Sequence, residues 1–262
     1  MSGLPLTDDY STVTETTGEA VRRDAIEKMY ARYSFAASRA ERRDVLDVAC
    51  GSGQGLSLLA AAAKSVVGGD YTPSLVVDAA KHYGSRITFV CLDAEALPFA
   101  AESFDMVLCY EALYYFPDAE KFLREAARVL RTNGELIVVS VNPSWAGFNR
   151  SPYSVRYHSA DELTSLLERH GFRADVRGAF PEREGGLVSR GIGLVRRGAV
   201  RLHLVPKTMR AKRILKRLFY GRLVPLPPEL DSRRATIPTL EPVGSDGGAA
   251  HTVLYGLGIK AS

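Results

Sequence analysis

Short apolar runs alternate along the chain with longer segments in which apolar residues return every three or four positions. The runs are typical of buried strands, and the longer segments are typical of amphipathic helices. The predicted strands cover residues 45–49, 65–70, 87–92, 104–110, 135–141 and 172–180. Helices are predicted to begin near residues 19, 56, 73, 118 and 159. Strands separated by helices in this way predict βαβ units and a parallel, doubly wound α/β sheet.

Two of the helices carry capping signals. Asp118 is a favourable N-cap, and the helix that follows it should end near Asn133 and Gly134. Ser159 is followed by Glu162 at the third position, which is the pattern of a capping box.

An N-terminal lid segment, residues 1–40, precedes the first strand. Within it, residues 19–38 have apolar positions at helical spacing and predict an amphipathic helix. Tyr10, Tyr30 and Tyr33 could reach a ligand from this segment, although aromatic residues at helical spacing more often belong to a core.

A glycine-rich turn joins the first strand to a segment of high helix propensity. Gly51, Gly53 and Gly55 allow positive φ and close backbone approach, and such a turn presents backbone N–H groups to an anionic ligand. Their G-x-G-x-G spacing differs from the G-x-G-x-x-G of a dinucleotide site, which disfavours a nicotinamide cofactor. Asp70 closes the second strand 17 residues after Gly53, where a ribose-binding carboxylate would sit.

Other predicted strands also end in polar residues. Asp93 follows the third strand, and Tyr110 and Glu111 form the end of the fourth. Ligands of such sheets bind at the carboxyl ends of the strands, near the point where the strand order reverses. The sequence therefore predicts one crevice lined by residues 51–53, Asp70, Asp93, Tyr110 and Glu111.

Composition agrees with a globular protein. The chain has 262 residues, of which 46% are hydrophobic and 24% charged, and we expect a single domain over residues 1–262. It contains neither an apolar run of membrane-spanning length nor a signal-peptide pattern, so a cytoplasmic location is expected. Cys50, Cys91 and Cys109 lie in or beside strands without paired spacing, which predicts small, buried, reduced residues and no metal site.

Several stretches together resemble the class I S-adenosylmethionine-dependent methyltransferases. They are VLDVACGSG at 45–53, GD at 69–70, DAEALPF at 93–99, SFDMV at 103–107 and RVLRTNGEL at 128–136. The resemblance covers roughly residues 40–180 and departs from the family at Ala49, where glycine is common. It implies a Rossmann-like, seven-stranded sheet of order 3-2-1-4-5-7-6, with residues 251–260 as the antiparallel strand 7.

The resemblance implies S-adenosyl-L-methionine as methyl donor and S-adenosyl-L-homocysteine as product. It carries cofactor-binding roles to Asp47, Ala49, Gly51, Ser52, Gly53, Asp70, Tyr71, Asp93, Ala94 and Tyr110. Asp70 would accept hydrogen bonds from both ribose hydroxyls, Tyr71 would pack on adenine, and Asp93 would accept from the adenine amine.

Methyl transfer needs a general base only when the acceptor carries a proton of high pKa. The candidate bases are Glu111, Tyr115 and His158, with Tyr110 and Tyr114 as further candidates. The tyrosines could equally be core aromatics, and His158 could be a solvated loop residue. The Tyr-Glu-Ala-Leu sequence after the fourth strand lacks the motif of methyltransferases that act on planar amines of adenine or glutamine.

A strongly basic segment separates the sixth strand from the last one. Residues 183–222 contain 12 Lys or Arg and one acid, so the rest of the chain carries a net charge of −7 against a total of +4. Within an insertion at 182–248, residues 207–220 predict a basic amphipathic helix. It could contact a membrane surface, bind an anionic ligand, form a homodimer contact or cover the substrate side of the sheet, whereas nucleic acid is disfavoured.

The sequence thus predicts methyl transfer to an oxygen or nitrogen nucleophile of a small molecule. A sugar or glycosyl metabolite is the preferred acceptor, because of the basic segment. The alternatives are a quinone or lipid-like acceptor, and a catalytically silent partner subunit that binds the cofactor.

Overall fold

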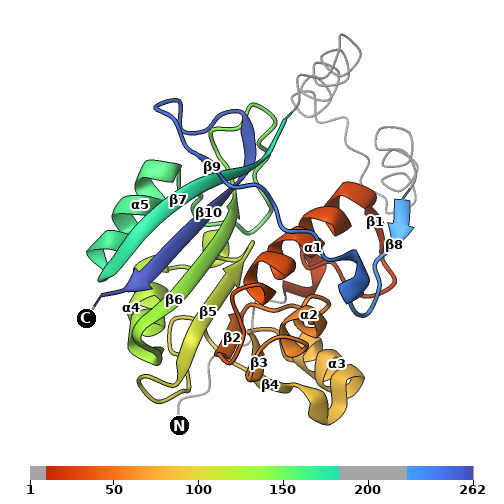
Figure 1. Cartoon of the computed structure of the whole chain (residues 1–262). Helices are drawn as coiled ribbons and strands as arrows, with labels where there is room; N and C mark the ends of the chain where they lie inside the picture. Colours follow the sequence, from red (N-terminus) through yellow and green to blue (C-terminus); the bar gives the residue numbers. More distant parts are fainter. Residues whose placement is uncertain (1–9, 183–222, 262) are drawn as a thin grey trace.

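A computed structural model describes residues 10–182 and 223–261, which form an α/β fold around one central sheet (Figure 1). The strands of this sheet are β2 (Asp44–Val48), β3 (Ser65–Asp70), β4 (Thr88–Cys91), β5 (Phe104–Tyr110), β6 (Leu130–Val141), β7 (Phe172–Pro181), β9 (Glu241–Pro242) and β10 (His251–Lys260). Their order is β4-β3-β2-β5-β6-β10-β7-β9. The pairs among β4, β3, β2, β5 and β6 are parallel, and β10 is antiparallel to both of its neighbours.

The predicted count of seven strands is wrong by one edge strand. The additional strand, β9, has only two residues and pairs with Arg177 and Gly178 of β7. A two-residue strand has no periodicity from which it could be recognised. The predicted bounds of the strands at 65–70, 104–110 and 251–260 are confirmed.

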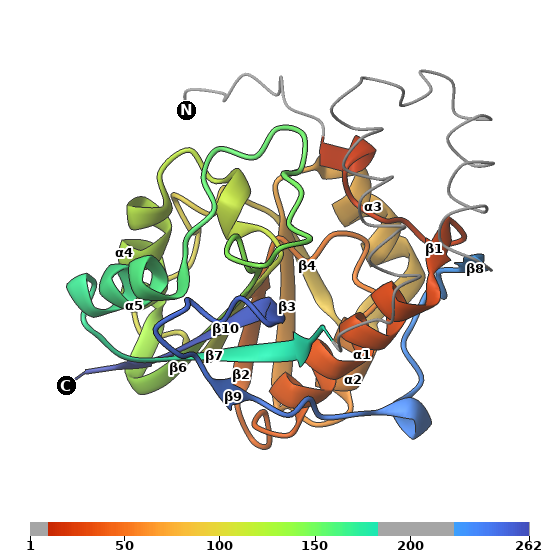
Figure 2. The same ribbon diagram turned by 90° about the horizontal axis from the view of Figure 1, so that it is seen from above.

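Helices cover both faces of the sheet, as Figure 2 shows from above. They are α1 (Arg23–Ala37), α2 (Leu56–Ala60), α3 (Pro73–Tyr83), α4 (Ala119–Val129) and α5 (Ala160–Arg169). Successive residues of a strand point to opposite faces. Val45 of β2 therefore joins a core with side chains of α1 and α2, whereas Leu46 joins a second core with side chains of α4 and α5.

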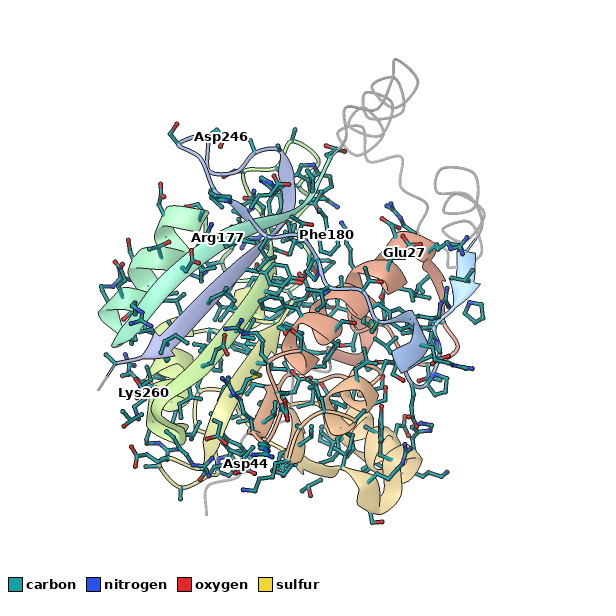
Figure 3. All side chains as sticks on the ribbon, in the orientation of Figure 1. Glu27, Asp44, Arg177, Phe180, Asp246 and Lys260 are labelled. Atoms are coloured by element: carbon teal, nitrogen blue, oxygen red, sulfur yellow. The ribbon has the colours of Figure 1, made fainter. Side chains whose placement is uncertain are left out.

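Side chains fill the layers between sheet and helices (Figure 3). Phe180 of β7 packs against the core under α1, and Lys28 of α1 lies 5.5 Å above its ring. The predicted caps are confirmed: Asp118 accepts hydrogen bonds from the N–H groups of Glu120 and Lys121, and Ser159 forms its capping box with Glu162.

Three predicted boundaries shift for identifiable reasons. The first helix starts at Arg23 instead of residue 19, because β1 (Ala20–Arg22) pairs with β8 (Leu223–Pro225) in a separate two-stranded sheet. The run of helix-forming residues after the glycine turn extends from Leu56 to Ala63, but helix α2 ends at Ala60, since Ala63 bridges to Glu41. Helix α4 ends at Val129, because the following residues already belong to β6.

Cys50 and Cys109 are buried free thiols, as predicted. The prediction of burial is wrong for Cys91, which is exposed because it lies on the edge strand β4. Among the described residues no helix combines the length and the hydrophobicity that crossing a membrane requires. The predicted helix at 207–220 and its contacts lie outside the described residues.

Candidate active site

A cavity of about 610 Å³ lies at the carboxyl ends of β2, β3, β4 and β5. Of the predicted cofactor residues, seven line it: Ala49, Gly51, Asp70, Tyr71, Asp93, Ala94 and Tyr110. The candidate bases Glu111 and Tyr115 line the same cavity. The parallel topology brings these residues together, because every strand that precedes them ends at this edge of the sheet.

The turn after β2 has three residues in the left-handed region. Ala49 has φ of 61°, Gly51 of 58° and Gly53 of 79°. Glycine adopts such angles without steric cost, whereas alanine does not. Ala49 stands where the methyltransferases that the sequence resembles commonly have glycine, so it places a mild strain in the turn. The turn is fixed by the N–H of Gly51, which donates to Oδ2 of Asp70 at 2.9 Å.

Asp70 joins this turn to the end of β3. Its Oδ1 accepts from the N–H of Thr72 at 2.9 Å, and only 6% of the residue is exposed. Burial raises the pKa of the Asp70 carboxyl, and the hydrogen bonds from the backbone of Thr72 and Gly51 oppose that change. Each carboxylate oxygen can accept more than one hydrogen bond, so Asp70 retains the capacity to bind hydroxyl groups in the cavity.

Asp47 is buried in β2 behind the cavity and does not line it. Its Oδ2 accepts a hydrogen bond of 2.8 Å from the hydroxyl of Tyr33, whereas its Oδ1 has no partner among the described residues. Burial raises the pKa of the Asp47 carboxyl to about 7. Tyr33 does line the cavity, so its hydrogen bond links Asp47 indirectly to the site.

Ser52 and Gly53 also lie behind the cavity wall. The Ser52 hydroxyl accepts from the amide of Gln54 at 3.1 Å, and the carbonyl of Gly53 accepts from the hydroxyl of Tyr83 at 2.8 Å. A side chain on Gly55 would place Cβ 2.1 Å from the ring of Tyr33, so this glycine is needed for packing.

The far wall of the site is formed by the ends of β3 and β4. Asp93 uses Oδ1 to accept from the N–H of Glu95 at 2.8 Å, which orders the turn containing Ala94. Tyr71 lines the cavity 6.2 Å from the ring of Tyr10, measured between centroids.

Glu111 sits at the end of β5 with φ of 54°. Its Oε1 accepts from Nη1 of Arg32 at 2.9 Å, and its Oε2 accepts from the hydroxyl of Tyr114 at 3.2 Å. The hydroxyls of Tyr115 and Ser151 lie 2.6 Å apart. A non-glycine residue held in the left-handed region marks a position where the surrounding structure imposes the backbone conformation, as functional sites often do.

His158 is not brought to this cavity. It lines a separate hollow with Arg156 and Glu162 near the start of α5. Burial, and next the charge of Arg156, lower the pKa of its imidazole.

Arg32 and Ser151 line the cavity and were not singled out in the sequence. Arg32 lies on helix α1 three positions after Met29, which lines the same cavity. Lys28, one helical turn earlier, is also basic, so no isolated charge in an apolar stripe marks Arg32 in the sequence. Ser151 lies in an irregular loop that offers no signal of this kind either.

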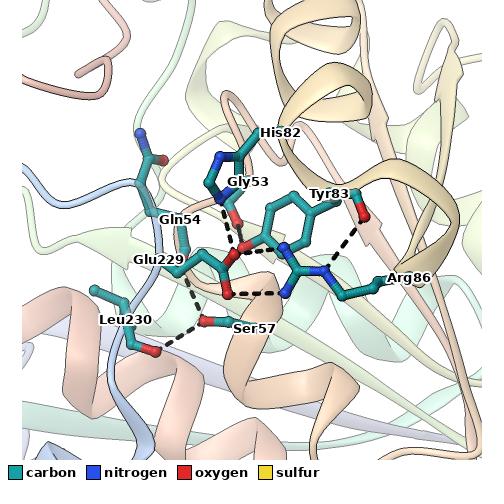
Figure 4. Close-up of polar contacts among 8 residues, drawn as sticks. All are labelled: Gly53, Gln54, Ser57, His82, Tyr83, Arg86, Glu229 and Leu230. Atoms are coloured by element: carbon teal, nitrogen blue, oxygen red, sulfur yellow. Dashed lines mark hydrogen bonds and ion pairs between the residues drawn. The ribbon is translucent and has the colours of Figure 1, made fainter.

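The segment of residues 223–236, which we call the strap, braces the turn from outside (Figure 4). The N–H of Leu230 donates to the carbonyl of Gln54 at 2.9 Å, and the hydroxyl of Ser57 donates to the carbonyl of Leu230, also at 2.9 Å. Glu229 pairs with Arg86 at 2.6 Å and with His82 at 2.8 Å. The turn is therefore held between α3 and a segment from the other end of the chain.

Asp70 and Asp93 offer acceptors on neighbouring strand ends, and Gly55 in the glycine turn has no room for a side chain. Over residues 10–182 and 223–261, no group of His, Cys, Asp or Glu is arranged to hold a metal ion.

Residues 46–138 match the family model described as a methyltransferase domain. Residues 46–138 therefore form a methyltransferase domain, and curated relatives matched over about half of the chain are named as S-adenosylmethionine-dependent methyltransferases. The cofactor of this family is S-adenosylmethionine, and the residues around the cavity fit it.

Among curated relatives, a "Probable S-adenosylmethionine-dependent methyltransferase" of Mycobacterium tuberculosis is 35% identical over 144 residues, which are 53% of this chain and 52% of the relative. A ubiquinone biosynthesis O-methyltransferase of Coxiella burnetii is 31% identical over 110 residues, which are 40% of this chain and 47% of the relative. The chain thus spans about half the length of the curated relatives it matches. The YcgJ protein from Bacillus subtilis has the same fold, with a TM-score of 0.59, 21% identity, and coverage of 90% of this chain and 99% of that one.

Proposed function

We propose that this protein transfers a methyl group from S-adenosylmethionine to an oxygen or nitrogen nucleophile of a small molecule. The observation that supports this most directly is that the glycine turn, Asp70 and Glu111 open into one cavity. Cofactor and acceptor could therefore meet in one cavity.

The cofactor would supply an electrophilic methyl group on a positively charged sulfur. A lone pair of the acceptor would form the new bond to the methyl carbon, and the electron pair of the broken carbon–sulfur bond would stay on sulfur. The protein's main contribution to such a displacement is positioning. In this proposal Asp70 binds the ribose hydroxyls, Asp93 and Ala94 bind the adenine, and Tyr71 packs on it. Asp47 acts indirectly, by fixing Tyr33 and offsetting positive charge near the turn.

Glu111 is proposed as the group that receives the acceptor's proton. It is a carboxylate on the cavity wall, and its position is fixed by Arg32 and Tyr114. Tyr115 is proposed to orient the acceptor with Ser151. His158 has no role in this proposal, because it does not line the cavity.

The wall near Glu111 favours a ring-bearing acceptor. Tyr10, Tyr114, Tyr115 and Phe116 line this side, and their rings offer flat apolar faces. The preference for a glycosyl acceptor rested on the basic segment, which lies outside the described residues. The ubiquinone O-methyltransferase among the relatives adds support for a ring with a hydroxyl group.

Titration with S-adenosylhomocysteine in a calorimeter tests the cofactor site. Asp70→Ala should weaken binding by more than tenfold, whereas the control Asp175→Ala, at a side chain 51% exposed on β7, should not. An unchanged dissociation constant for Asp70→Ala would refute the ribose role. Tight binding of NAD without binding of S-adenosylmethionine would refute the proposal as a whole.

Labelled S-adenosylmethionine with pools of phenols and quinols, glycosides and polyprenyl lipids tests the acceptor. Label is expected in the phenol and quinol pool. Label in glycosides alone would restore the sugar hypothesis. Binding of S-adenosylhomocysteine without transfer to any pool or cell extract would instead support a silent partner subunit.

A further inference from the structure

An arginine with unused hydrogen-bond donors lies beside Glu111 in the cavity wall. Nη1 of Arg32 donates to Glu111 at 2.9 Å, and Nε donates to the carbonyl of Lys28 at 3.2 Å. Nη2 has no partner among the described residues, although the side chain is only 13% exposed. The guanidinium thus offers its remaining N–H groups to the cavity that it lines.

Such an arrangement favours an anionic oxygen as the missing partner. A guanidinium carries five donors in a fixed planar fork that matches a carboxylate or another oxyanion. An oxyanion that accepts from Nη2 would add a charge-assisted hydrogen bond, which is stronger than one between neutral groups.

Arg32 is the one basic side chain in the described lining of the cavity, which also contains the acids Glu15, Asp70, Asp93, Glu95 and Glu111. Glu111 is the only acid that pairs with it in the described residues, and that carboxylate also accepts from Tyr114. A second cationic group, Lys28, lies one helical turn earlier and donates to the hydroxyl of Thr252 at 3.0 Å. Among the described lining residues, Arg32 is therefore the one place where an anionic oxygen finds a cationic partner.

The cavity walls beside Arg32 indicate which kind of molecule would carry the negative charge. The rings of Tyr10 and Tyr115 have centroids 5.7 Å apart, and those of Tyr114 and Tyr115 are 4.6 Å apart. Met29 completes this side of the cavity. These aromatic and thioether groups suit the faces and edges of a planar ring.

We propose that the methyl acceptor is a planar aromatic molecule with an anionic oxygen, and that Nη2 of Arg32 binds that oxygen. This inference rests on the proposed methyl-transfer function and specifies its acceptor. The oxygen belongs either to a ring carboxylate beside the nucleophile or to a phenolate that is itself the nucleophile. In the second case the phenolic proton passes to Glu111, and Arg32 stabilises the resulting negative oxygen.

Calorimetry on protein saturated with S-adenosylhomocysteine tests the inference with three ring-matched probes. They are ortho-hydroxybenzoate, 4-nitrophenolate and the neutral 2-hydroxybenzyl alcohol. At least one anion should bind tenfold or more tightly than the neutral probe. Preference for the benzoate alone identifies a carboxylate partner, and preference for the phenolate alone identifies a phenolate.

The variants isolate Arg32 from Glu111. Glu111→Gln should retain the preference for the anion. In the double variant Arg32→Met with Glu111→Gln, the ratio of anion affinity to neutral-probe affinity should fall at least tenfold. The double variant removes both partners of the ion pair, so neither charge is left unpaired. Arg233→Met is the matched control, because Arg233 lies on the strap with its side chain 88% exposed, and should behave as the parent protein.

Equal affinity for all three probes would overturn the inference. Undetectable binding of all three probes would also overturn it. A preference that persists in the double variant would do the same. The dissociation constant of S-adenosylhomocysteine, measured on the same samples, keeps the two proposals apart. A parent protein that does not bind S-adenosylhomocysteine contradicts the proposed function. Normal cofactor binding without a preference for an anionic probe contradicts only the role of Arg32.

Discussion

The hydroxyl of Tyr33 on α1 donates a hydrogen bond of 2.8 Å to the carboxylate of Asp47 on β2. Asp47 is 1% exposed, and its other oxygen has no partner among the described residues. This contact fastens the first helix to the central strand directly behind the glycine turn. It therefore couples the covering helix to the cofactor site.

Removal of this phenol should weaken both folding and cofactor binding. Tyr33→Phe keeps the ring but removes the hydrogen bond to the Asp47 carboxyl, at an expected cost of about 1–3 kcal/mol in unfolding free energy. Urea denaturation and calorimetry with S-adenosylhomocysteine measure the two effects. Tyr30→Phe removes a phenol on the same helix that accepts from the N–H of Asp231, and it should leave cofactor affinity unchanged. Equal losses of cofactor affinity in both variants would contradict a specific role for the Tyr33 contact.

The raised pKa of Asp47 predicts a pH dependence of stability. Burial lifts this pKa from 3.8 to about 7, so the folded state retains the proton more firmly than the unfolded state. Its contribution to stability is present at low pH and is lost as pH rises from the unfolded pKa to about 7. Urea unfolding of the parent protein and of Asp47→Asn between pH 4 and 8 should show a difference that changes across this window. A constant difference would rule out the titration of Asp47 there.

Gly55 should not tolerate even one added methyl group. Its Cβ would lie 2.1 Å from the Tyr33 ring, so Gly55→Ala should cost about 1–3 kcal/mol or more through overpacking. Gly244→Ala is a suitable control, because its nearest atom is a flexible Asp246 oxygen at 3.2 Å. Thermal unfolding compares the two, and a Gly55→Ala protein as stable as the control would show that Tyr33 can move aside.

Ala49 should accept glycine. At φ of 61° alanine is strained, so Ala49→Gly relieves a local cost, but the more flexible unfolded chain offsets part of the gain. We expect a stability change between zero and about +1 kcal/mol in urea denaturation. Ala49→Val should be clearly destabilising, because a β-branched side chain fits the left-handed region poorly. A destabilised Ala49→Gly protein would mean that the Ala49 methyl group makes an important contact.

The strap should stabilise the turn through its apolar anchor more than through its ion pairs. Leu230 is 3% exposed, and Leu230→Ala should cost about 2–5 kcal/mol and weaken binding of S-adenosylhomocysteine. Glu229→Gln removes partly exposed ion pairs with Arg86 and His82 and should cost no more than about 1 kcal/mol. The reverse order of the two effects in denaturation experiments would assign the anchoring to Glu229.

Features that depend on local sequence were predicted well. The strand at 104–110 follows from its apolar run, and the helix start at Ser159 follows from a capping box formed within four residues. The position of the crevice followed from topology, because parallel strands bring Asp70 and Asp93 to one edge.

Features that depend on tertiary contact were not predicted. Arg32 reaches Glu111 across 79 positions of sequence, and Leu230 reaches Gln54 across still more. Neither contact leaves a periodic signal, because each depends on how α1 and the strap pack on the sheet. His158 was chosen from its place in a loop after β6, but that loop directs it to a separate hollow.

The hydrogen bond between Leu230 and Gln54 also determines when the site can be completed during biosynthesis. The glycine turn leaves the ribosome early, but the backbone group that braces its outer side is made some 175 residues later. At about 5–20 residues per second, that interval lasts on the order of ten seconds or more. During this time the cofactor turn exists without its brace, so the binding site is completed only after the strap has been made. A cell that produces this protein must keep the unfinished sheet from aggregating until the strap arrives.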